Sequence, residues 1–339
     1  MGVNIAELLP KKELHLADLK NKKIAIDASN ALYQFVASIR QPDGTLLMDS
    51  RGRVTSHLQG LFTRTTNLMS KGLRLCYVFD GKPPALKLKE QQERATRKLE
   101  AETKYQKAVE EENLEAMRKY SKQFSRLTKD MIQESKTLIQ ALGLPVIEAP
   151  SEAEAQAAFM CKTRHVWAVA SQDSDSLLFG ASRLLRNLTL SQKRRLPSGK
   201  HVITFLEEIE LNAVLKELNI THDQLIALGI LVGTDFNRGG VRGIGPRKAL
   251  KLLYTYKNNF DELFSTLKTD FDWKEIFTLF KDIPITKEYE LLWKKPDQEA
   301  IKKLLVDEHE FNEERVQGVL DKLTEEASPS NQKGLGDFL

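Results

Sequence analysis

Acidic residues follow apolar segments repeatedly in this sequence. The stretch "VWAVASQDSDSLLFG", residues 166–180, is an apolar run that leads into Asp173 and Asp175. Two carboxylates this close repel each other and raise each other's pKa unless a cation neutralises them. Because alternate residues of an extended chain point to the same side, both can face a single cation. The pattern indicates either a metal site or a cap for the helix that starts at "SLLFG".

Five further acids occupy similar positions. They are Asp27 in "KKIAIDAS", Asp80 in "LCYVFDGKPP", Glu152 and Glu154 in "APSEAEAQAA", and Asp235 in "LGILVGTDFN". Taken singly, Asp27 can cap the following helix, and Ser151 with Glu154 fits a capping box. Caps do not explain why Glu152 stands beside Glu154. An oxygen-only set without His or Cys favours Mg²⁺ over zinc, and its size predicts two ions, as in phosphodiester cleavage.

The elements that must position these acids are strands and helices in alternation. The apolar segments before Asp27, Asp80 and Asp173 are short and rich in β-branched or aromatic residues, and helical patterns separate them. This alternation predicts an α/β fold with a mostly parallel sheet. Ligands of such sheets bind at the carboxyl ends of the strands, where these acids stand. The segment before Asp235 has helical spacing and Thr221 as its cap. Beyond residue 200 the pattern predicts helices almost throughout, to about residue 324.

Composition limits the class of protein. The chain has 339 residues with 29% charged and 41% hydrophobic side chains, as in soluble globular proteins, and no apolar run long enough to span a membrane. The N-terminal segment lacks the pattern of a signal peptide. Cys76 and Cys161 suit neither a disulfide framework nor zinc, which favours a reducing compartment. A net charge of +4 permits a nucleic-acid partner without proving one.

With these motifs in view, the sequence resembles the flap endonucleases, a family of structure-specific 5′ nucleases. The resemblance rests on "IAIDASNALYQF", "VFDGKPPALK", "APSEAEAQAA", "SQDSDSLLFG", "VGTDFNRGGVRGIGPRKAL" and "QKGLGDFL" in that order. It implies a single nuclease domain over residues 1–330 with a PIN-like core. The parts expected are core segments at 1–84 and 136–235, a helical arch or cap at 85–135, a helix-two-turn-helix element at 222–262, C-terminal helices at 263–325 and a flexible tail at 328–339.

The resemblance also implies an activity. It is Mg²⁺-dependent cleavage at the base of 5′ DNA flaps, with 5′–3′ exonuclease activity, in Okazaki-fragment maturation and long-patch base excision repair. Two Mg²⁺ ions are implied, for which Mn²⁺ can substitute. The first ion would be held by Asp27, Asp80, Glu152 and Glu154, and the second by Asp173, Asp175 and Asp235, with Glu154 shared.

Basic residues after "DGKPP" match the family's catalytic pair, Lys87 and Arg94. They are seven residues apart and so share one face of a helix. Without the resemblance, a solvated helix with salt bridges is the favoured interpretation of these charges. Arg97 and Lys98 would then steer the single strand.

Two further contacts with the substrate are implied on and after the first helix. Tyr33 would stack on a base near the cut phosphate; its alternative is core packing. Arg40 and the loop of residues 41–57 fall where the family opens the junction and holds a 3′ flap.

Residues 242–250, "RGIGPRKAL", form a candidate contact with duplex DNA. Gly243 and Gly245 would let backbone amides approach a phosphate at a helix start, with Arg247 and Lys248 beside them. In the family this element also binds K⁺. An ordinary tight turn is the alternative.

The tail matches the sliding-clamp motif of PCNA partners. Its anchors would be Gln332, Leu335, Phe338 and Leu339; a frayed terminus is the alternative. The printed sequence stops at this motif, which suggests an archaeal form, placed in the cytoplasm or nucleoid (in the nucleus if eukaryotic). The expected partners are branched double-stranded DNA and the clamp, with a monomeric protein otherwise and no membrane.

Three alternatives to a flap endonuclease stay open. An exonuclease or gap nuclease of the same family fits all the motifs. An aspartate-nucleophile phosphatase of the HAD type suits "DSDS" but explains neither Glu152 and Glu154 nor the glycine turn. A non-catalytic DNA-binding protein tethered to a clamp needs no cluster of acids.

Overall fold

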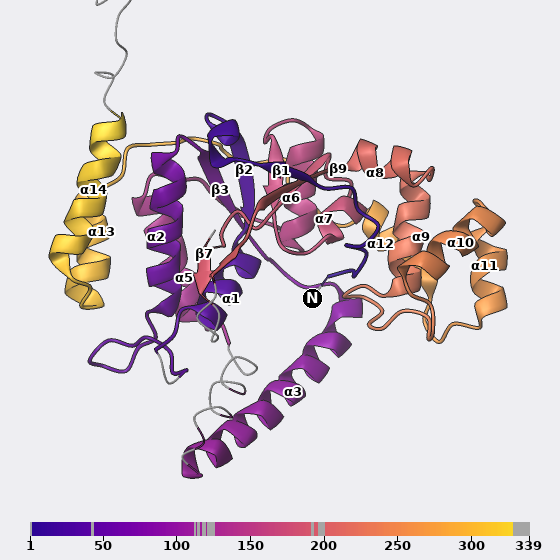
Figure 1. Ribbon diagram of the computed structural model, residues 1–339, viewed down its shortest axis with the longest axis horizontal. Helices are drawn as coiled ribbons and strands as arrows, with labels where there is room; N and C mark the ends of the chain where they lie inside the picture. The colour runs from indigo at the N-terminus through magenta and orange to yellow at the C-terminus, as the bar shows by residue number, and fades with distance from the viewer. Residues whose placement is uncertain are drawn as a thin grey trace, which may run out of the picture.

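The computed structural model describes residues 2–41, 44–111, 113, 116, 120, 126–190, 193–195 and 201–327. Its centre is a seven-stranded sheet in the order β1-β9-β6-β5-β2-β3-β4 (Figure 1). The strands are β1 (Lys12–Leu14), β2 (Lys23–Asp27), β3 (Arg74–Phe79), β4 (Val146–Glu148), β5 (Ala168–Ala170), β6 (Arg183–Arg186) and β9 (Leu206–Glu210). Strand β2 pairs in parallel with both β3 and β5, and only β9 brings antiparallel pairing, with β6 and β1. The predicted mostly parallel α/β sheet is therefore confirmed.

Helices cover both faces of this sheet. Side chains of a strand alternate between its two faces, and those of β2 are apolar on both, so each face packs against helices. Ile24 and Ile26 of β2 belong to a hydrophobic cluster with α1 (Ala28–Ser38), α2 (Ser56–Ser70) and α5 (Lys129–Ala141). Ala25, between them, belongs to a cluster with α6 (Ala153–Lys162) on the other face. Strand β2 is thus packed on both faces, which fixes the position of Asp27 at its end.

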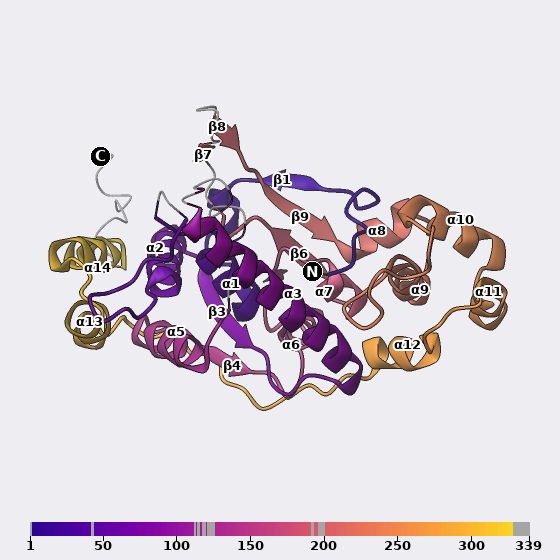
Figure 2. The ribbon, with the colours of Figure 1, turned by 90° about the horizontal axis from the view of Figure 1, so that it is seen from below.

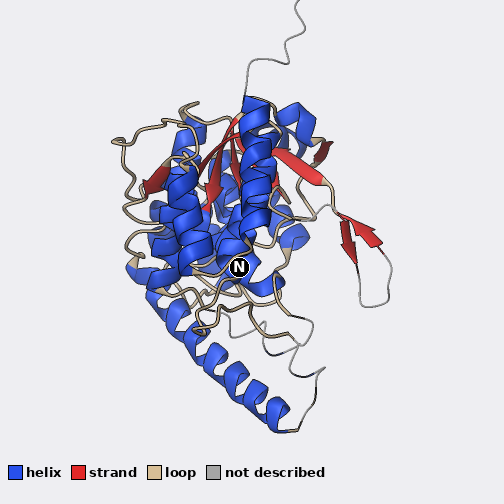
Figure 3. Cartoon of the chain, turned by 90° about the vertical axis from the view of Figure 1, so that its left-hand side faces the viewer, coloured by secondary structure: helices blue, strands red, loops and turns tan. Residues whose placement is uncertain are grey.

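Strand β9 departs from the prediction of helices beyond residue 200. Its sequence "LEEIE" has the charge of a helix surface, yet Leu206 and Ile209 are buried and Glu208 is only 6% exposed. The Glu208 carboxylate is paired with Arg183 Nε at 2.5 Å, which offsets the cost of burying it. A second departure is the hairpin of β7 (Lys193–Arg195) and β8 (His201–Ile203), which stands to one side of the main sheet (Figure 3).

Helix α3 (Ala85–Glu110) leaves the body of the protein after β3, as its polar sequence predicts (Figure 1). Helix α5, which follows in the described chain, instead packs on the sheet through Leu138 and Ile139. Within the described ranges, none of the helices combines the length and the apolar composition of a transmembrane segment.

The C-terminal half forms helices on two opposite sides of the sheet (Figure 2). One group shares its own hydrophobic cluster and comprises α7 (Asp175–Leu178), α8 (Leu211–Glu217), α9 (His222–Val232), α10 (Pro246–Tyr256), α11 (Phe260–Leu267) and α12 (Trp273–Lys281). The other consists of α13 (Gln298–Lys302), the π-helix η2 (Lys303–Glu308) and α14 (Glu313–Ala327), which contacts α2.

An extended segment, residues 282–297, joins these two groups and is attached to the core by side chains. The amide of Gln156 on α6 donates to the Thr286 carbonyl at 2.9 Å and accepts from its N–H at 2.8 Å. Trp293 Nε1 donates to the Leu75 carbonyl at 2.7 Å. The C-terminal half is therefore fixed to both α6 and β3.

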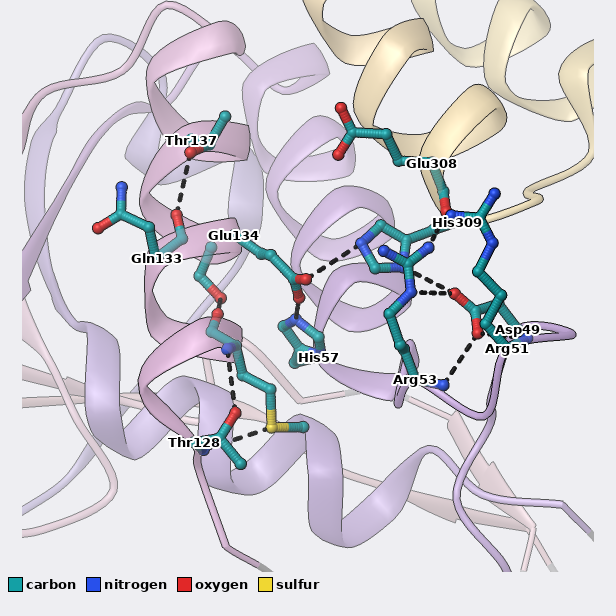
Figure 4. A network of polar contacts seen from close by, with 12 residues as sticks. Asp49, Arg51, Arg53, His57, Thr128, Gln133, Glu134, Thr137, Glu308 and His309 are labelled. Carbon is teal, nitrogen blue, oxygen red and sulfur yellow. Dashed lines mark hydrogen bonds and ion pairs between the residues drawn. The ribbon is translucent and has the colours of Figure 1, made fainter.

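A network of charged residues binds the loop between α1 and α2 to the C-terminal segment (Figure 4). The carboxylate of Glu134 on α5 lies 3.0 Å from His57 Nε2 and 3.2 Å from His309 Nε2. His309 Nδ1 lies 3.3 Å from Asp49, which also accepts from Arg53 Nε at 2.8 Å. Both ring nitrogens of buried His309 therefore lie beside carboxylates. Through Glu134 and Asp49 this residue joins segments that are far apart in the sequence.

We expect Glu134→Gln to lower the free energy of unfolding by about 1–3 kcal/mol at neutral pH, since a charged hydrogen-bond acceptor is lost. Partial burial favours the protonated form, but the hydrogen bond from His57 and the charge of His309 hold the pKa of Glu134 below its ordinary value. Its contribution is therefore present above the unfolded pKa of 4.5 and lost as the pH falls through the lower folded pKa.

Urea unfolding at a series of pH values tests this expectation. The difference between wild type and Glu134→Gln should shrink between pH 5 and pH 3, values chosen to bracket the titration of a carboxyl group. Asp130→Asn, an exposed acid on the same helix, serves as the control and should change little. A difference that stays constant with pH would contradict the role given to Glu134.

Candidate metal centre

Seven acidic residues meet at the carboxyl edge of the parallel sheet. Asp27 ends β2, Asp80 follows β3, and Asp173 follows β5. Because these strands are parallel neighbours, their ends lie at the same edge. The remaining four acids come from the first residues of α6 and α7 and from the loop after α9; they are Glu152, Glu154, Asp175 and Asp235. The structure therefore brings together all seven acids singled out in the sequence.

The charges of these acids act on one another. Burial and the charges of Asp80 and Asp173 raise the pKa of Asp27 to about 8. Burial, Asp235 and Asp173 raise the pKa of Asp175 to about 7. Burial and the charges of Asp175, Asp27 and Asp173 raise the pKa of Glu154 well above its usual range. The ionised cluster is unfavourable unless positive charge is supplied.

The donor set fits hard divalent cations. All seven groups offer oxygen, with no thiolate or imidazole among them, which suits Mg²⁺ or Mn²⁺. Among the described residues, no three acidic, histidine or cysteine side chains already adopt the arrangement of a coordination shell.

Hydrogen bonds orient the acids from β2 and β3. Asp27 Oδ1 accepts from the Asn30 N–H at 3.0 Å, so Asp27 does cap α1 while it faces the cluster. Asp80 Oδ1 accepts from the Ala153 N–H at 2.8 Å and so caps α6. A Cβ atom at Gly81 would lie 2.0 Å from the Ala149 carbonyl oxygen, so only glycine allows the backbone after Asp80 to pass this close.

Two interpretations of the acids as helix caps were wrong. Ser151 and Glu154 form no capping box, because α6 begins one residue later than that motif requires, with Glu152 as its N-cap. Glu154 Oε1 instead accepts from Ser171 Oγ at 3.1 Å. Helix α7 has Ser174 as its N-cap, so neither Asp173 nor Asp175 caps it.

The N-terminal segment also reaches this site, which the sequence did not reveal. The Val3 N–H donates to Asp175 Oδ1 at 2.6 Å. A Cβ atom at Gly2 would lie 2.7 Å from Asp173 Cβ and 2.8 Å from Asp175 Oδ1. Nothing in "MGVNIAE" signals this role, since it depends only on where the first residues pass in the folded chain.

Lys87, in the first turn of α3, points into the cluster of acids. Its Nζ contacts Glu152 Oε2 and lies 3.6 Å from Asp235 Oδ2. Burial opposes the charge of Lys87, but Glu152 and Asp235 outweigh it and raise the pKa of Lys87. Lys87 is thus an ammonium group at the site, and the solvated alternative does not hold for it. Arg94 lies on α3, but its side chain is outside the described set.

Tyr33 and Lys98 meet beside the site. Tyr33 on α1 is 38% exposed, so the alternative of core packing is wrong. Lys98 Nζ on α3 lies 4.9 Å from the centre of its ring, and Arg97 precedes Lys98 on the same helix. An exposed ring beside a cation is suited to a nucleobase.

Arg40 forms hydrogen bonds with backbone carbonyls on either side of residues 41–43. Its side chain donates to the carbonyls of Ala37 at 3.3 Å and Gly44 at 2.8 Å. It therefore supports the loop that begins at residue 41.

The glycine turn before α10 is open. Gly243 has a φ of 78°, Gly245 is the N-cap of α10, and a Cβ atom at either would meet nothing within 4 Å. Lys248 Nζ lies 3.5 Å from the Gly243 carbonyl, and Arg247 pairs with Glu7 at 3.6 Å. The clamp-motif residues Gln332, Leu335, Phe338 and Leu339 lie outside the described residues.

Comparisons with known proteins agree with this architecture. The chain matches the XPG N-terminal domain over residues 1–101 and the XPG I-region over residues 143–235. Flap endonuclease 1 of Pyrococcus horikoshii is 50% identical over 99% of this chain and 97% of that protein. Flap endonuclease 1 of Aeropyrum pernix is 48% identical over 95% of this chain and 94% of that protein.

Solved structures give the same result. The flap endonuclease-1 from Methanococcus jannaschii has a TM-score of 0.77 at 42% identity, covering 96% of this chain and 98% of that chain. The catalytic core of Rad2 in complex with DNA substrate shares the fold, with a TM-score of 0.70 at 22% identity over 94% of this chain and 97% of that chain. The resemblance inferred from the six sequence stretches is confirmed.

We expect Gly2→Ala to lower the free energy of unfolding by about 1–3 kcal/mol, as an overpacked methyl group does. The added Cβ would collide with Asp173 Cβ and Asp175 Oδ1. Urea unfolding measures the effect, with Asn4→Ala, an exposed position on the same segment, as the control. Equal stability of both variants would show that the N-terminal segment does not pack on the acids as described.

Proposed function

The chain belongs to the flap endonuclease family, and on this premise we propose that it hydrolyses the phosphodiester at the base of 5′ flaps in branched DNA. The observation that carries the proposal is the gathering of seven carboxylates beside the ammonium group of Lys87 at one edge of the sheet. Cleavage of a phosphodiester needs positive charge around the reacting phosphate, and this edge is suited to gather it. With 5′–3′ exonuclease activity, the enzyme would act in Okazaki-fragment maturation and long-patch base excision repair.

Two Mg²⁺ ions are the cofactors we propose, with Mn²⁺ as a substitute. The first would be held by Asp27, Asp80, Glu152 and Glu154, and the second by Asp173, Asp175 and Asp235, with Glu154 shared. When bound, such ions stabilise both the attacking and the leaving oxygen of a phosphodiester. The oxygen-only donor set and the raised pKa values of Asp27 and Asp175 support this assignment.

Lys87 would stabilise charge on the reacting phosphate. Its pKa is raised by Glu152 and Asp235, so it stays charged at neutral pH. Its ammonium group contacts Glu152, and a phosphate oxygen close to the acids would offer it a further acceptor. Arg94, seven residues further along α3, would act with it.

The single strand would pass α3, with Arg97 and Lys98 drawing the phosphates and Tyr33 stacking on a base. Stacking of this kind contributes about 1–3 kcal/mol per base. Residues 85–135, the segment expected to form the arch, would cover the strand, although the end of this segment, from Lys129, belongs to α5.

Duplex DNA would be held on two surfaces. The open turn at Gly243 and Gly245, with Arg247 and Lys248, would bind phosphates of one arm and a K⁺ ion. The loop of residues 41–57, supported by Arg40, would separate the arms of the junction and hold a 3′ flap. Phosphate contacts of this kind are independent of sequence, so the branched shape of the DNA would select the site of cleavage.

Cleavage of a labelled double-flap DNA tests the central proposal. With Mg²⁺ we expect one cut at the base of the 5′ flap, and none with chelator. Asp175→Ala should reduce the rate by at least about 100-fold while binding of the flap DNA in Ca²⁺ persists, because ligand loss affects chemistry more than DNA binding.

The controls for this assay address the alternatives. Glu299→Gln, a change of an exposed acid on α13 outside the proposed DNA contacts, should cleave like wild type. Faster cutting of nicked or gapped DNA than of the flap would favour an exonuclease or gap nuclease. Equal cutting in chelator, or a wild-type rate for Asp175→Ala, would refute the metal-dependent mechanism.

We also propose that residues 332–339 bind a sliding clamp. Deleting them should abolish co-elution with the PCNA ring of an archaeon in size-exclusion chromatography, because Phe338 and Leu339 supply the apolar anchors of the motif. The double variant Phe338→Ala, Leu339→Ala should behave like the deletion, and Lys333→Ala should co-elute like wild type. Co-elution of the deleted protein would contradict the assignment.

A further inference from the structure

Asn30, in the first turn of α1, touches both halves of the acid cluster. Its backbone N–H donates to Asp27 Oδ1 at 3.0 Å, and its side-chain Nδ2 donates to Asp173 Oδ2 at 3.0 Å. Its side-chain oxygen faces the Gln172 N–H at 3.4 Å. One residue therefore connects the end of β2 with the segment after β5.

The Asn30 side chain is partly buried beside a small cavity. This cavity of about 10 Å³, about the space that one water molecule needs, borders Asp27, Asn30, Ser171, Gln172 and Thr189. The orientation of the Asn30 amide therefore depends on its hydrogen bonds with Asp173 and Gln172.

An amide is the side chain suited to this position. Asp173 is already coupled by charge to Asp27, Glu154 and Asp175. A carboxylate at residue 30 would add to this repulsion, whereas the amide Nδ2 donates a hydrogen bond and carries no charge. The Asn30 amide binds Asp173 Oδ2, so Asp173 Oδ1 does not take part in this hydrogen bond.

The backbone of Asp173 has a support of its own. Ser171 Oγ accepts from the Asp173 N–H at 3.2 Å and donates to Glu154 Oε1 at 3.1 Å. Loss of the Asn30 side chain would therefore leave the loop after β5 attached. We expect this loss to change only the orientation of the Asp173 carboxylate.

From these contacts we propose that Asn30 is a positioning residue for the metal centre. It holds the Asp173 carboxylate at a set orientation relative to Asp27 and thereby sets the spacing between the ligands of the two ions. This inference rests on the proposed function, because it requires that the acids bind divalent cations.

Titration calorimetry with Ca²⁺ alone, without DNA, tests the inference. Asn30→Ala should weaken the binding of one ion by about 10- to 100-fold, as loss of a supporting hydrogen bond does at other metal sites. Gln34→Ala is the matched control, because Gln34 lies one turn along α1. Among the described residues its side chain has one hydrogen bond, which Thr189 Oγ1 donates, so the variant should bind Ca²⁺ like wild type.

Two further measurements separate positioning from a folding defect. In chelator, Asn30→Ala should melt close to wild type, whereas Asn30→Asp should melt lower and recover on addition of Mg²⁺, because added repulsion is then neutralised. In flap cleavage, Asn30→Ala should need about 10-fold or more Mg²⁺ for half its maximal rate and approach the wild-type rate when Mg²⁺ is saturating.

The possible outcomes are distinct. If wild type binds no Ca²⁺, both the metal centre and the role of Asn30 are refuted. If wild type binds Ca²⁺ and Asn30→Ala binds it equally well, only the role of Asn30 is refuted. A rate of Asn30→Ala that stays low at every Mg²⁺ concentration would also overturn it.

Discussion

Repulsion among carboxylates at one edge of the sheet is the constraint that organises this protein. Parallel pairing of β2 with β3 and β5 places Asp27, Asp80 and Asp173 at that edge, and the helices that follow add the others. Burial, and then the charges of neighbouring carboxylates, raise the pKa of Asp27, Glu154 and Asp175. The fold therefore holds these groups together against their preference for separation in water. Positive charge supplied at this edge would offset the repulsion, as the proposed metal ions would do.

Packing and hydrogen bonds in the rest of the core hold the acids in place. Strand β2 is buried on both faces, and backbone donors at the starts of α1 and α6 bind Asp27 and Asp80. The C-terminal half contributes Asp235 and is itself attached through Gln156 and Trp293. Since Gln156 lies on the helix that carries Glu152 and Glu154, the attachment of the C-terminal half also supports the site.

Basic side chains surround the cluster of acids, and they range from partly buried to exposed. Lys87 is inside the cluster, Lys98 lies over an exposed tyrosine, and Arg247 and Lys248 stand at the open glycine turn. On the far side, the buried His309 joins Glu134 and Asp49 and fixes the loop between α1 and α2. These positions suit the branched DNA that we propose as the substrate, in which one phosphate would react and others would only be held.

Much of this could be predicted from the sequence because the signals are local. Apolar strands that end in acids, alternating with helical patterns, are sufficient to predict the parallel sheet, the seven acids and their common edge, and six ordered stretches identify the family. Strand β9 escaped prediction because its buried Glu208 is paired with Arg183, a residue of another strand. The hydrogen bond between Asp80 and the start of α6 escaped it too, since Asp80 lies far from that helix along the chain.

The sequence alone determines the residue types and their order along the chain. These were enough to predict the fold class, the family and the gathering of seven acids at one edge of the sheet. Contacts between distant segments were decided only by the tertiary structure. Examples are Gly2 and Val3 against Asp175, Asn30 against Asp173, and His309 between Glu134 and Asp49. Each depends on hydrogen bonds and close packing between groups that no spacing in the sequence relates, because their distance is set by how strands and helices assemble around the core.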